Sequence, residues 1–319
     1  MAVYTKVSAE EIDQFLKRYD VGTLISAKGI AEGVENSNYL IETTQDRFIL
    51  TLYEKRVDPG DLPFFIDMLD HLAANNCPVP PMIADRVGEK VQQLCGRFAC
   101  LITFLPGVSV TNPTSVQSRA AGAALGRMHQ ALLDFDQSRP NDMSHDGWRK
   151  LAEQCGETDL NNIQQGLFDL VHHELDNLDQ NWPTGLSESV VHADLFPDNV
   201  LMLNDQITGL IDFYFSCTDI RAYDLAVTHT AWCFNDTDDS FCPNISEALI
   251  DGYVSSFRLS DMERDALPTL ARGAALRFLL SRAYDWINTP ADALVTRKDP
   301  KAFLKRLRYY QNHPEIFAK

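Results

Sequence analysis

The stretch His192-Ala193-Asp194-Leu195-Phe196-Pro197-Asp198-Asn199 decides the fold, together with Ile211-Asp212-Phe213 further along the chain. Two apolar residues, Val190-Val191, lead into the first stretch, so we expect a buried strand that breaks into a loop at the histidine. Apolar runs over residues 200–203 and 207–211, separated by a turn-forming Asn-Asp pair, predict a β-hairpin. Such a hairpin would bring Asp212 back beside Asn199.

These residues gather two carboxylates and one carboxamide, a set that suits phosphoryl transfer. An aspartate accepts the proton of an attacking hydroxyl, while oxygen atoms of an asparagine and a second aspartate hold Mg²⁺ on the phosphates of a nucleotide. The pattern H-x-D-L-x-x-x-N matches the catalytic loop of kinases, and Asp212-Phe213 stands where a D-F-G motif would follow. We therefore predict Asp194 as the catalytic base, with Asn199 and Asp212 as metal ligands.

The motifs resemble the aminoglycoside phosphotransferase and choline kinase branch of the protein-kinase-like fold. Within that branch, residues 29–39, 50–54 and 212–215 are similar to the corresponding segments of the bacterial homoserine kinases. The resemblance extends to about residue 235 and continues more weakly to the end of the chain. It implies a phosphotransferase that uses ATP and Mg²⁺ to phosphorylate the hydroxyl of homoserine, a step toward threonine.

The resemblance also implies an α+β, protein-kinase-like fold with two lobes. Residues 1–105 would form a small, β-rich nucleotide-binding lobe, and residues 106–319 a larger, mainly helical lobe for catalysis and substrate binding. In the first part, Ser8 and Glu11 form a capping box that predicts a helix to about Tyr19. Periodicity further predicts strands over residues 39–41 and 48–52, a helix over 61–74, and a strand from 97 that ends at a Pro-Gly turn.

Helical periodicity dominates the second part of the chain. Helices are predicted over residues 114–135, 160–179, 223–234, 245–257, 261–286 and 300–311, with a break at Pro268 left open. In the first of these helices, Gly122 and Gly126 favour close packing against a neighbour, and His129 is interpreted as a core histidine rather than a catalytic one. The pair His172-His173 lacks the spacing of a metal site, which favours a solvated helix face.

Two segments of the first lobe are candidates for binding the nucleotide. The loop over residues 33–38 lacks a G-x-G-x-x-G pattern, so the backbone amides of Asn36, Ser37 and Asn38 would cover the phosphates. A surface turn would have the same composition, and the catalytic motif downstream favours the functional interpretation. In the strand that begins at residue 97, the backbone from Thr103 to Leu105 would act as the hinge that binds adenine.

The first lobe departs from the kinase pattern at two positions. The fold normally has a lysine or arginine on its third strand, paired with a helix glutamate, but Thr51 and Phe65 stand at the apparent positions. Cations that could reach phosphate instead are Lys28, Arg47, Lys55 and Arg56, although the composition favours a solvated surface charge for each of them. The residue patterns do not choose among these four.

Other residues around the motif are assigned supporting roles. We expect His192 to hold the catalytic loop by hydrogen bonds, and in the family the residue matching Asp224 is a structural prop of this loop. An amino-acid substrate carries an ammonium and a carboxylate, and the candidates to contact it flank the motif: Asp198, Tyr214, Asp219, Trp232 and Arg277. A charge amid apolar residues needs a partner, so Arg277 would face either the substrate carboxylate or a structural aspartate.

Composition narrows the classes of partner. The formal net charge of -17 opposes a nucleic acid or an anionic membrane as partner, because both require basic patches. No uncharged apolar run of about 18 residues predicts a membrane span, and the N-terminus lacks an apolar signal core. Seven widely spaced cysteines indicate reduced thiols in a cytoplasmic protein. The expected partners are a small-molecule substrate and ATP, with no obligate protein partner indicated.

Several other functions stay open at this stage. The acceptor could be choline, an aminoglycoside or methylthioribose, and the Thr51 departure gives some support to a pseudokinase that binds nucleotide without turnover. Protein kinase activity is disfavoured because Asp212-Phe213-Tyr214 lacks the glycine of D-F-G and no A-P-E segment follows. The chain also lacks a Walker-type phosphate loop and a G-x-S-x-G elbow, which disfavours other phosphate-binding folds and hydrolases.

Overall fold

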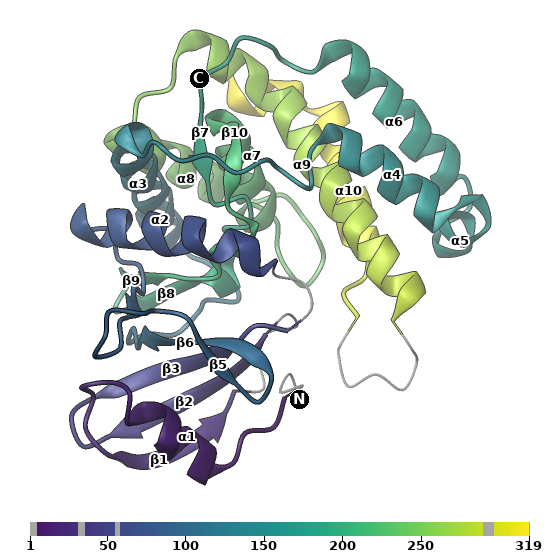
Figure 1. The fold of residues 1–319 in the computed structure, drawn as a ribbon. Coiled ribbons are helices and arrows are strands. Elements are labelled where there is room, and N and C mark those ends of the chain that lie inside the picture. Colours follow the sequence, from purple (N-terminus) through teal and green to yellow (C-terminus); the bar gives the residue numbers. More distant parts are fainter. Residues whose placement is uncertain (1–4, 31–35, 55–57, 290–296, 319) are drawn as a thin grey trace. The chain divides into compact units, whose positions relative to one another are not determined.

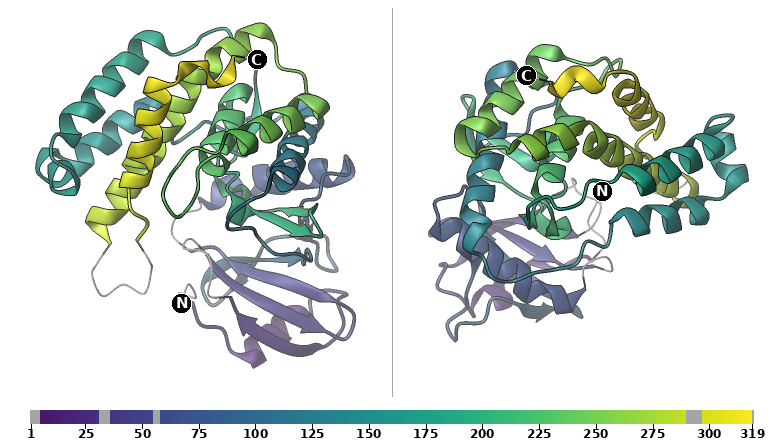
Figure 2. Two further views of the ribbon diagram at one scale, coloured as in Figure 1. Left: turned by 180° about the vertical axis from the view of Figure 1, so that it is seen from behind. Right: turned by 90° about the horizontal axis from the view of Figure 1, so that it is seen from above.

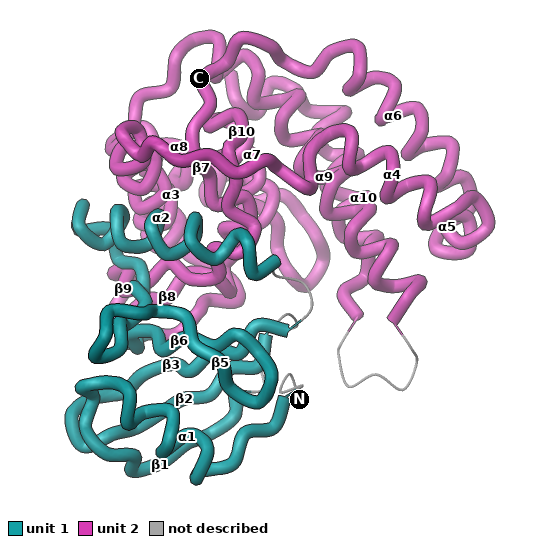
Figure 3. The backbone as a smooth tube through the Cα atoms, in the orientation of Figure 1, with its two compact units in different colours: residues 1–107 teal, residues 108–319 magenta. Residues whose placement is uncertain are grey.

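The computed structural model describes residues 5–30, 36–54, 58–289 and 297–318. Contacts between Cα atoms divide the chain into two compact units, Met1–Gly107 and Val108–Lys319 (Figure 3). Antiparallel strands dominate the first unit and helices dominate the second, which is the α+β composition expected from the sequence. Within the described ranges no helix is long and apolar enough to cross a membrane. The functional assignment of a nucleotide lobe over residues 1–105 remains a prediction.

One antiparallel sheet forms the framework of the first unit (Figure 1). Its strands follow the order β1 (Leu24–Gly29), β2 (Ser37–Thr43), β3 (Arg47–Leu52), β6 (Arg97–Thr103) and β4 (Met82–Ile83), and β5 (Gln92–Leu94) pairs with β6. The strands predicted over residues 39–41 and 48–52 lie in β2 and β3. Fully buried positions of β2 alternate with more exposed ones, which is the physical basis of the period-two signal in the sequence.

Two helices complete the first unit. Helix α1 (Ala9–Leu16) begins at the predicted capping box, in which Ser8 Oγ accepts from the Glu11 N–H at 3.2 Å and Glu11 Oε2 accepts from the Ser8 N–H at 2.8 Å. Its face of Ile12, Phe15 and Leu16 packs into the core against β2 and β3. The helix ends at Leu16 rather than near Tyr19. Helix α2 (Leu62–Ala74) is the one predicted over residues 61–74.

The second unit contains two small antiparallel sheets. Strand β7 (Glu188–Val191) pairs with β10 (Cys217–Ile220). In the sequence between these two strands, β8 (Val200–Leu203) and β9 (Gln206–Leu210) form the predicted hairpin as a separate sheet. Both residues of the hairpin turn have positive φ, 48° at Asn204 and 60° at Asp205, which asparagine and aspartate tolerate better than other side chains. The turn therefore sets the register that returns the chain toward Asp212.

Helices make up the rest of the second unit (Figure 1). They are α3 (Ser115–Ala131), α4 (His145–Cys155), α5 (Glu157–Ile163), α6 (Leu167–Asn181), α7 (Arg221–Trp232), α8 (Pro243–Ser256), α9 (Asp261–Asn288) and α10 (Lys301–Asn312). Every residue of α7 is buried, so this helix lies at the centre of the unit. Its buried position matters for the site, because α7 follows β10 directly.

Two predicted helix ranges were wrong in detail, and the break left open at Pro268 does not occur. Residues 160–179 do not form one helix, because Gly166 at φ +78° separates α5 from α6. Helix α9 continues through Pro268, since its buried residues on both sides of the proline, Leu267 and Leu270, hold it in the core. The first helix ends at Ala131 and its last turn is a 3-10 turn over Leu132–Asp134.

Helix α4 was not predicted at all. Its buried residues, Trp148, Ala152 and Cys155, follow one another at helical spacing, so periodicity alone would have found it. The cysteine pattern, in contrast, agrees with the expectation from the sequence. None of the seven cysteines forms a disulfide, and Cys77, Cys100, Cys155, Cys217 and Cys233 are buried.

The predicted close packing at Gly122 is confirmed, and its partner is helix α8. A Cβ atom at Gly122 would lie 2.0 Å from the carbonyl oxygen of Leu249, and one at Gly252 would lie 2.0 Å from the carbonyl oxygen of Arg119. At Gly126 the nearest atom would be the Tyr253 carbonyl oxygen at 2.8 Å. These glycines let the backbones of α3 and α8 touch, a contact that no side chain could replace.

We expect Gly122→Ala to lower the free energy of unfolding by about 2–4 kcal/mol, since the added methyl group forces two helix backbones apart. Chemical denaturation monitored by circular dichroism measures the loss. The control is Val116→Ala on the exposed side of the same helix, where the side chain is 62% exposed. Equal stability of the two variants would show that the helices can separate without cost.

Candidate active site

The catalytic loop begins where β7 ends, and one carboxylate holds its first two peptide groups. Asp224 accepts from the backbone N–H of His192 at Oδ2 and from that of Ala193 at Oδ1, both at 2.8 Å. The carboxylate has no exposed surface and projects from the first turn of α7, where the helix dipole also favours a negative charge. Asp224 therefore fixes the direction in which the loop leaves the strand.

His129 also contacts the Asp224 carboxylate. Its Nε2 lies 3.0 Å from Asp224 Oδ2, and its Nδ1 lies 2.8 Å from the hydroxyl of Tyr253. Burial by itself would raise the pKa of Asp224, but the hydrogen bond and the charge of the histidine outweigh it and hold the pKa below its ordinary value. The prediction of a core histidine is confirmed, and its contact with Asp224 is a finding of the structure.

The peptide group after Ala193 is held at its other end by an arginine. Ala193 has φ +63°, a left-handed conformation that costs energy for any residue with a Cβ atom. Arg277 Nη1 donates to the Ala193 carbonyl oxygen at 2.6 Å, and only 2% of this side chain is exposed. Together, Asp224 and Arg277 maintain a strained backbone immediately before Asp194.

His192 uses both of its ring nitrogens within this framework. Its Nδ1 accepts from the backbone N–H of Asp194 at 3.3 Å, and its Nε2 donates to the carbonyl oxygen of Ile211 at 3.1 Å. Burial lowers the pKa of the imidazole, which keeps it in the neutral form with the proton on Nε2. The histidine therefore links the catalytic loop to the segment that carries Asp212.

Asp194 and Asn199 contact each other across the loop. Asn199 Nδ2 donates to the Asp194 backbone carbonyl at 2.8 Å and to its Oδ2 at 3.2 Å. The Ile211 N–H donates to the Asn199 carbonyl oxygen at 3.0 Å, so the hairpin brings the two motif segments together as predicted. Asp212 follows in a left-handed conformation at φ +65° and leads into a 3-10 turn over Phe213–Phe215. Strained backbone of this kind is concentrated at functional sites.

The donor set agrees with a hard divalent cation. Because the amide nitrogen of Asn199 is committed to Asp194, its Oδ1 is left as the acceptor, and no donor to that oxygen is found in the described part of the chain. A carboxamide oxygen and a carboxylate are the ligands that Mg²⁺ prefers. Across the same residues no cluster of three His, Cys, Asp or Glu side chains offers an alternative metal site.

The five predicted substrate residues have different surroundings. Trp232 is buried and its indole N–H donates to the Leu195 carbonyl oxygen at 2.9 Å, so it supports the catalytic loop as Arg277 does. Asp219 lies in β10 and accepts from Asn141, and burial raises the pKa of its carboxyl group. Asp198 is exposed and lies 3.4 Å from Lys298, and Tyr214 is partly buried.

In the first unit, the predicted phosphate-loop residues are already engaged with the strands beside them. Asn36 Oδ1 accepts from the Glu54 N–H at 3.4 Å, and Ser37 Oγ donates to Glu54 Oε1 at 2.7 Å. Asn38 Oδ1 accepts from the hydroxyl of Thr51 at 2.8 Å. Residues 33–35 of this loop lie outside the described residues.

The only cation in β3 is Arg47, which lies at the start of the strand, four residues before Thr51. The threonine is 2% exposed, and Phe65 in α2 is buried, so neither position carries the charge that kinases place there. Lys28 in β1 is exposed, and the Arg47 guanidinium lies 4.4 Å from the Phe104 ring. The two other candidate cations, Lys55 and Arg56, are outside the described residues.

An ion pair that the sequence did not reveal lies near the same strand. Arg97 Nε is 3.0 Å from the partly buried Glu54 Oε2. The two residues are far apart in sequence, and no local pattern marks the pair.

The predicted hinge over residues 103–105 differs along its length in the hydrogen bonds that its backbone makes. Thr103 directs its N–H and hydroxyl to the Pro81 carbonyl oxygen, at 3.2 and 3.3 Å. For the peptide groups of Phe104 and Leu105, the described ranges contain no backbone hydrogen bond. This edge is therefore available to hydrogen-bond a ligand.

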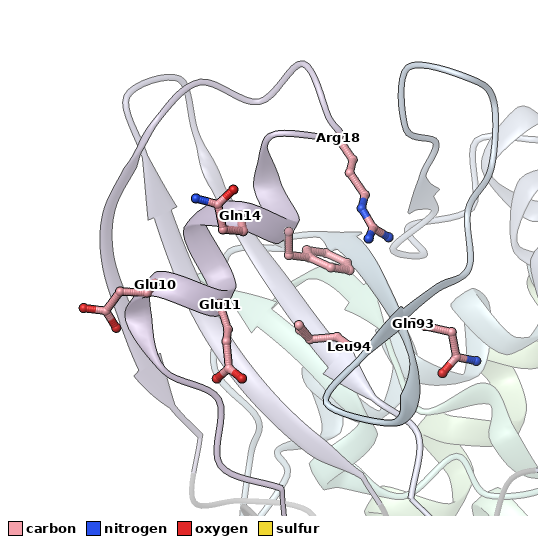
Figure 4. Close-up of a pocket in the computed structure, with 7 residues that line it drawn as sticks. Glu10, Glu11, Gln14, Arg18, Gln93 and Leu94 are labelled. Atoms are coloured by element: carbon pink, nitrogen blue, oxygen red, sulfur yellow. The ribbon is translucent and has the colours of Figure 1, made fainter.

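An open hollow of about 310 Å³ lies elsewhere in the first unit, between α1 and the β5 strand (Figure 4). Its lining residues are Glu10, Glu11, Gln14, Phe15, Arg18, Gln93 and Leu94. None of them belongs to the phosphoryl-transfer pattern, so this hollow is not the candidate active site.

Comparison with known proteins agrees with the geometry. Residues 26–267 match the phosphotransferase enzyme family. Amicoumacin kinase hAmiN, solved in complex with AMP-PNP, Ca²⁺ and Ami, shares the fold at a TM-score of 0.70 and 18% identity, covering 98% of this chain and 94% of that one. The chain is therefore a member of the phosphotransferase enzyme family, and its fold is the protein-kinase-like fold expected from the motifs.

Two relatives narrow the family further. The homoserine kinase of Zymomonas mobilis is 55% identical, with 98% of this chain and 97% of the relative covered. The homoserine kinase of Gluconobacter oxydans is 50% identical, with 99% and 100% covered. Within the phosphotransferases, this chain belongs to the homoserine kinases.

Asp224→Asn should lower the free energy of unfolding by about 2–3 kcal/mol and reduce kcat, because an amide cannot accept from both loop N–H groups. The contribution of the wild-type carboxylate is fully present above the unfolded-state pKa of about 3.9 and is lost as the pH falls through the lower folded-state pKa. Denaturation as a function of pH measures this. The control, Asp251→Asn, removes an exposed carboxylate from the Arg119 pair. A variant with wild-type stability and kcat would contradict the structural role of Asp224.

Proposed function

We propose that the chain transfers the γ-phosphoryl group of ATP to the hydroxyl of L-homoserine and forms O-phosphohomoserine for threonine biosynthesis. The observation that carries this proposal is the catalytic loop, in which Asp194, Asn199 and the Asp212 segment are linked by hydrogen bonds. Two homoserine kinases that are 55% and 50% identical over 98% and 99% of this chain also support the proposal. Phosphoryl transfer depends mainly on the positioning of the reacting groups and on electrostatic stabilisation, and a loop held by hydrogen bonds provides both.

Asp194 is the residue that orients the acceptor hydroxyl and accepts its proton. Its backbone is held by the Ala193 peptide on one side, and its carboxylate is oriented by Asn199 Nδ2 at 3.2 Å. A carboxylate held in this way adds little reorganisation cost at the moment of attack on the γ-phosphorus. His192 and Asp224 do not take part in the proton transfer, and they keep the loop in position.

Asn199 Oδ1 and the Asp212 carboxylate would hold the Mg²⁺ of the nucleotide. When bound, this ion would offset the negative charge that develops on the phosphate oxygens during transfer. The left-handed backbone of Asp212 sets the direction of its carboxylate.

For the nucleotide, we assign residues of the N-terminal lobe over residues 1–105. The peptide edge at Thr103 and Leu105 would bind adenine, and the backbone amides of Asn36, Ser37 and Asn38 would cover the phosphates. The first assignment is supported by the peptide groups of Phe104 and Leu105, which have no backbone hydrogen bond among the described residues. For the acceptor, Asp198 and Tyr214 stay as candidates, because Trp232 and Arg277 donate to the loop backbone and Asp219 accepts from Asn141.

Thr51 favours one alternative, a pseudokinase that binds ATP without turnover, since a buried threonine cannot pair with phosphate as a lysine would. Retention of the base and both metal ligands argues for turnover. An ADP-release assay with homoserine, with choline, an aminoglycoside and methylthioribose as comparison acceptors, separates these possibilities. Bound ATP without ADP release at any homoserine concentration would favour the pseudokinase.

Asp194→Asn should reduce kcat by about 10²–10⁴-fold, because the amide cannot accept the hydroxyl proton. The affinity for ATP should stay close to that of the wild type, since the metal ligands remain. Steady-state kinetics and calorimetric titration of ATP measure the two effects. Asp205→Asn in the hairpin turn is the matched control and should leave kcat unchanged. An unaltered kcat in the Asp194 variant would rule out its role as base.

Asp212→Asn should weaken MgATP binding and turnover together, by about 10–100-fold in kcat/KM, because one charged metal ligand is lost. Asparagine tolerates the left-handed backbone of this position, so the loop should keep its conformation. Titration of activity with Mg²⁺ should show a higher concentration for half-maximal rate. An identical Mg²⁺ dependence in variant and wild type would exclude Asp212 as a ligand.

A further inference from the structure

Three phenylalanine rings meet beside the catalytic loop. Phe196 lies in the loop between Asp194 and Asn199, Phe278 lies in α9 and Phe303 in α10. The Phe196 and Phe278 ring centroids are 4.8 Å apart, and those of Phe278 and Phe303 are 5.2 Å apart. Helices α9 and α10 lie side by side in both directions of view (Figures 1 and 2). The cluster therefore connects the reacting loop to the surface of two packed helices.

Four cations surround this aromatic cluster, although the chain as a whole is strongly acidic. The guanidinium carbons of Arg282 and Arg306 lie 4.4 and 4.6 Å from the Phe303 centroid. Arg277 lies 4.7 Å from the Phe278 centroid, and Lys298 lies 5.9 Å from the Phe196 centroid. Gathering positive charge at one place in a chain of net charge -17 indicates a local need for it.

Three of the four cations have a polar partner. Arg277 donates to the Ala193 carbonyl oxygen, and Arg306 donates to the Thr230 carbonyl oxygen at 2.8 Å. Lys298 lies 3.4 Å from an Asp198 oxygen. These partners account for the positions of the three side chains without a ligand.

Arg282 is the exception. It lies one helical turn after Phe278, is only partly exposed, and has neither a hydrogen bond nor an ion pair with any described residue. Burial and the charge of Arg306 lower its pKa to about 10, although the carboxylates of Asp198 and Asp194 act in the opposite direction. A guanidinium held out of water without a partner costs free energy, and a bound anion removes that cost.

We propose that Arg282 binds the α-carboxylate of the acceptor and so selects a hydroxy amino acid over an amino alcohol. The inference rests on the proposed function, in which Asp194 holds the hydroxyl of the same small molecule. A guanidinium offers two parallel N–H groups to a carboxylate, and contact with the Phe303 ring restricts the movement of this one. The same chemistry would also fit the transferred phosphoryl group, and the experiment distinguishes these two anions.

The test compares Arg282→Ala and Arg282→Lys with the wild type. The two acceptors are homoserine and 3-amino-1-propanol, which is homoserine without its carboxylate and is called aminopropanol below. Arg282→Ala should raise KM for homoserine by about 10–100-fold, with kcat and KM for ATP nearly unchanged. Its KM for aminopropanol should not change. Arg282→Lys should recover part of the affinity, because it keeps the charge and loses the bidentate geometry. Arg308→Ala, an exposed arginine on α10, is the control.

Calorimetric titration of the two acceptors in the presence of a non-hydrolysable ATP analogue gives the same contrast without turnover, and melting temperatures confirm that the variants fold. An equal loss of kcat with both acceptors would overturn the proposal and assign Arg282 to the phosphoryl group. Unchanged affinity for homoserine in Arg282→Ala would also overturn it. Failure of the wild-type protein to phosphorylate homoserine would instead reject the proposed function itself.

Discussion

The hydrogen bonds from two loop peptides to Asp224 are the constraint on which the site depends. A single carboxylate accepts the N–H groups of His192 and Ala193, each at 2.8 Å, and His129 holds it from the opposite side. A buried carboxylate is stable only with such partners, so the loop and α7 stabilise each other. The left-handed conformation of Ala193, which an unsupported loop would lose, follows from this pairing and from the Arg277 contact.

Further buried charges on the surrounding helices are also paired with an opposite charge. Arg221 and Glu263 form a buried pair at 2.8 Å, and Arg272 contacts both carboxylate oxygens of Glu174 at 2.7 Å. Arg282 beside the catalytic loop differs from these paired arginines, because it has no hydrogen-bond or ion-pair partner among the described residues. This difference points to a ligand. Removal of one partner from a buried ion pair lowers the stability of the fold, so Arg221 and Arg272 are each paired with a carboxylate. A buried arginine without such a partner is stabilised by a bound anion.

Sequence reasoning worked best where the signal is local. Residues close together in the chain predict the hairpin of β8 and β9, the capping box at Ser8 and the amphipathic helices. The single helix predicted over residues 160–179 was wrong, because one glycine at positive φ separates two helices there. The break left open at Pro268 does not occur, because core packing on both sides keeps α9 continuous. Local preferences of about 1–3 kcal/mol are easily outweighed by tertiary contacts.

The sequence by itself determined the chemistry, because the interval from Asp194 to Asn199 and the hairpin before Asp212 fix which polar groups meet. The reach of the backbone leaves few other arrangements over so short a span. Only the tertiary structure decided which distant side chains hold that arrangement: His129 behind Asp224, Arg277 on Ala193, Trp232 on Leu195. These partners lie on separate helices, and their meeting depends on how the helices pack, a cooperative property of the whole core that no local pattern encodes.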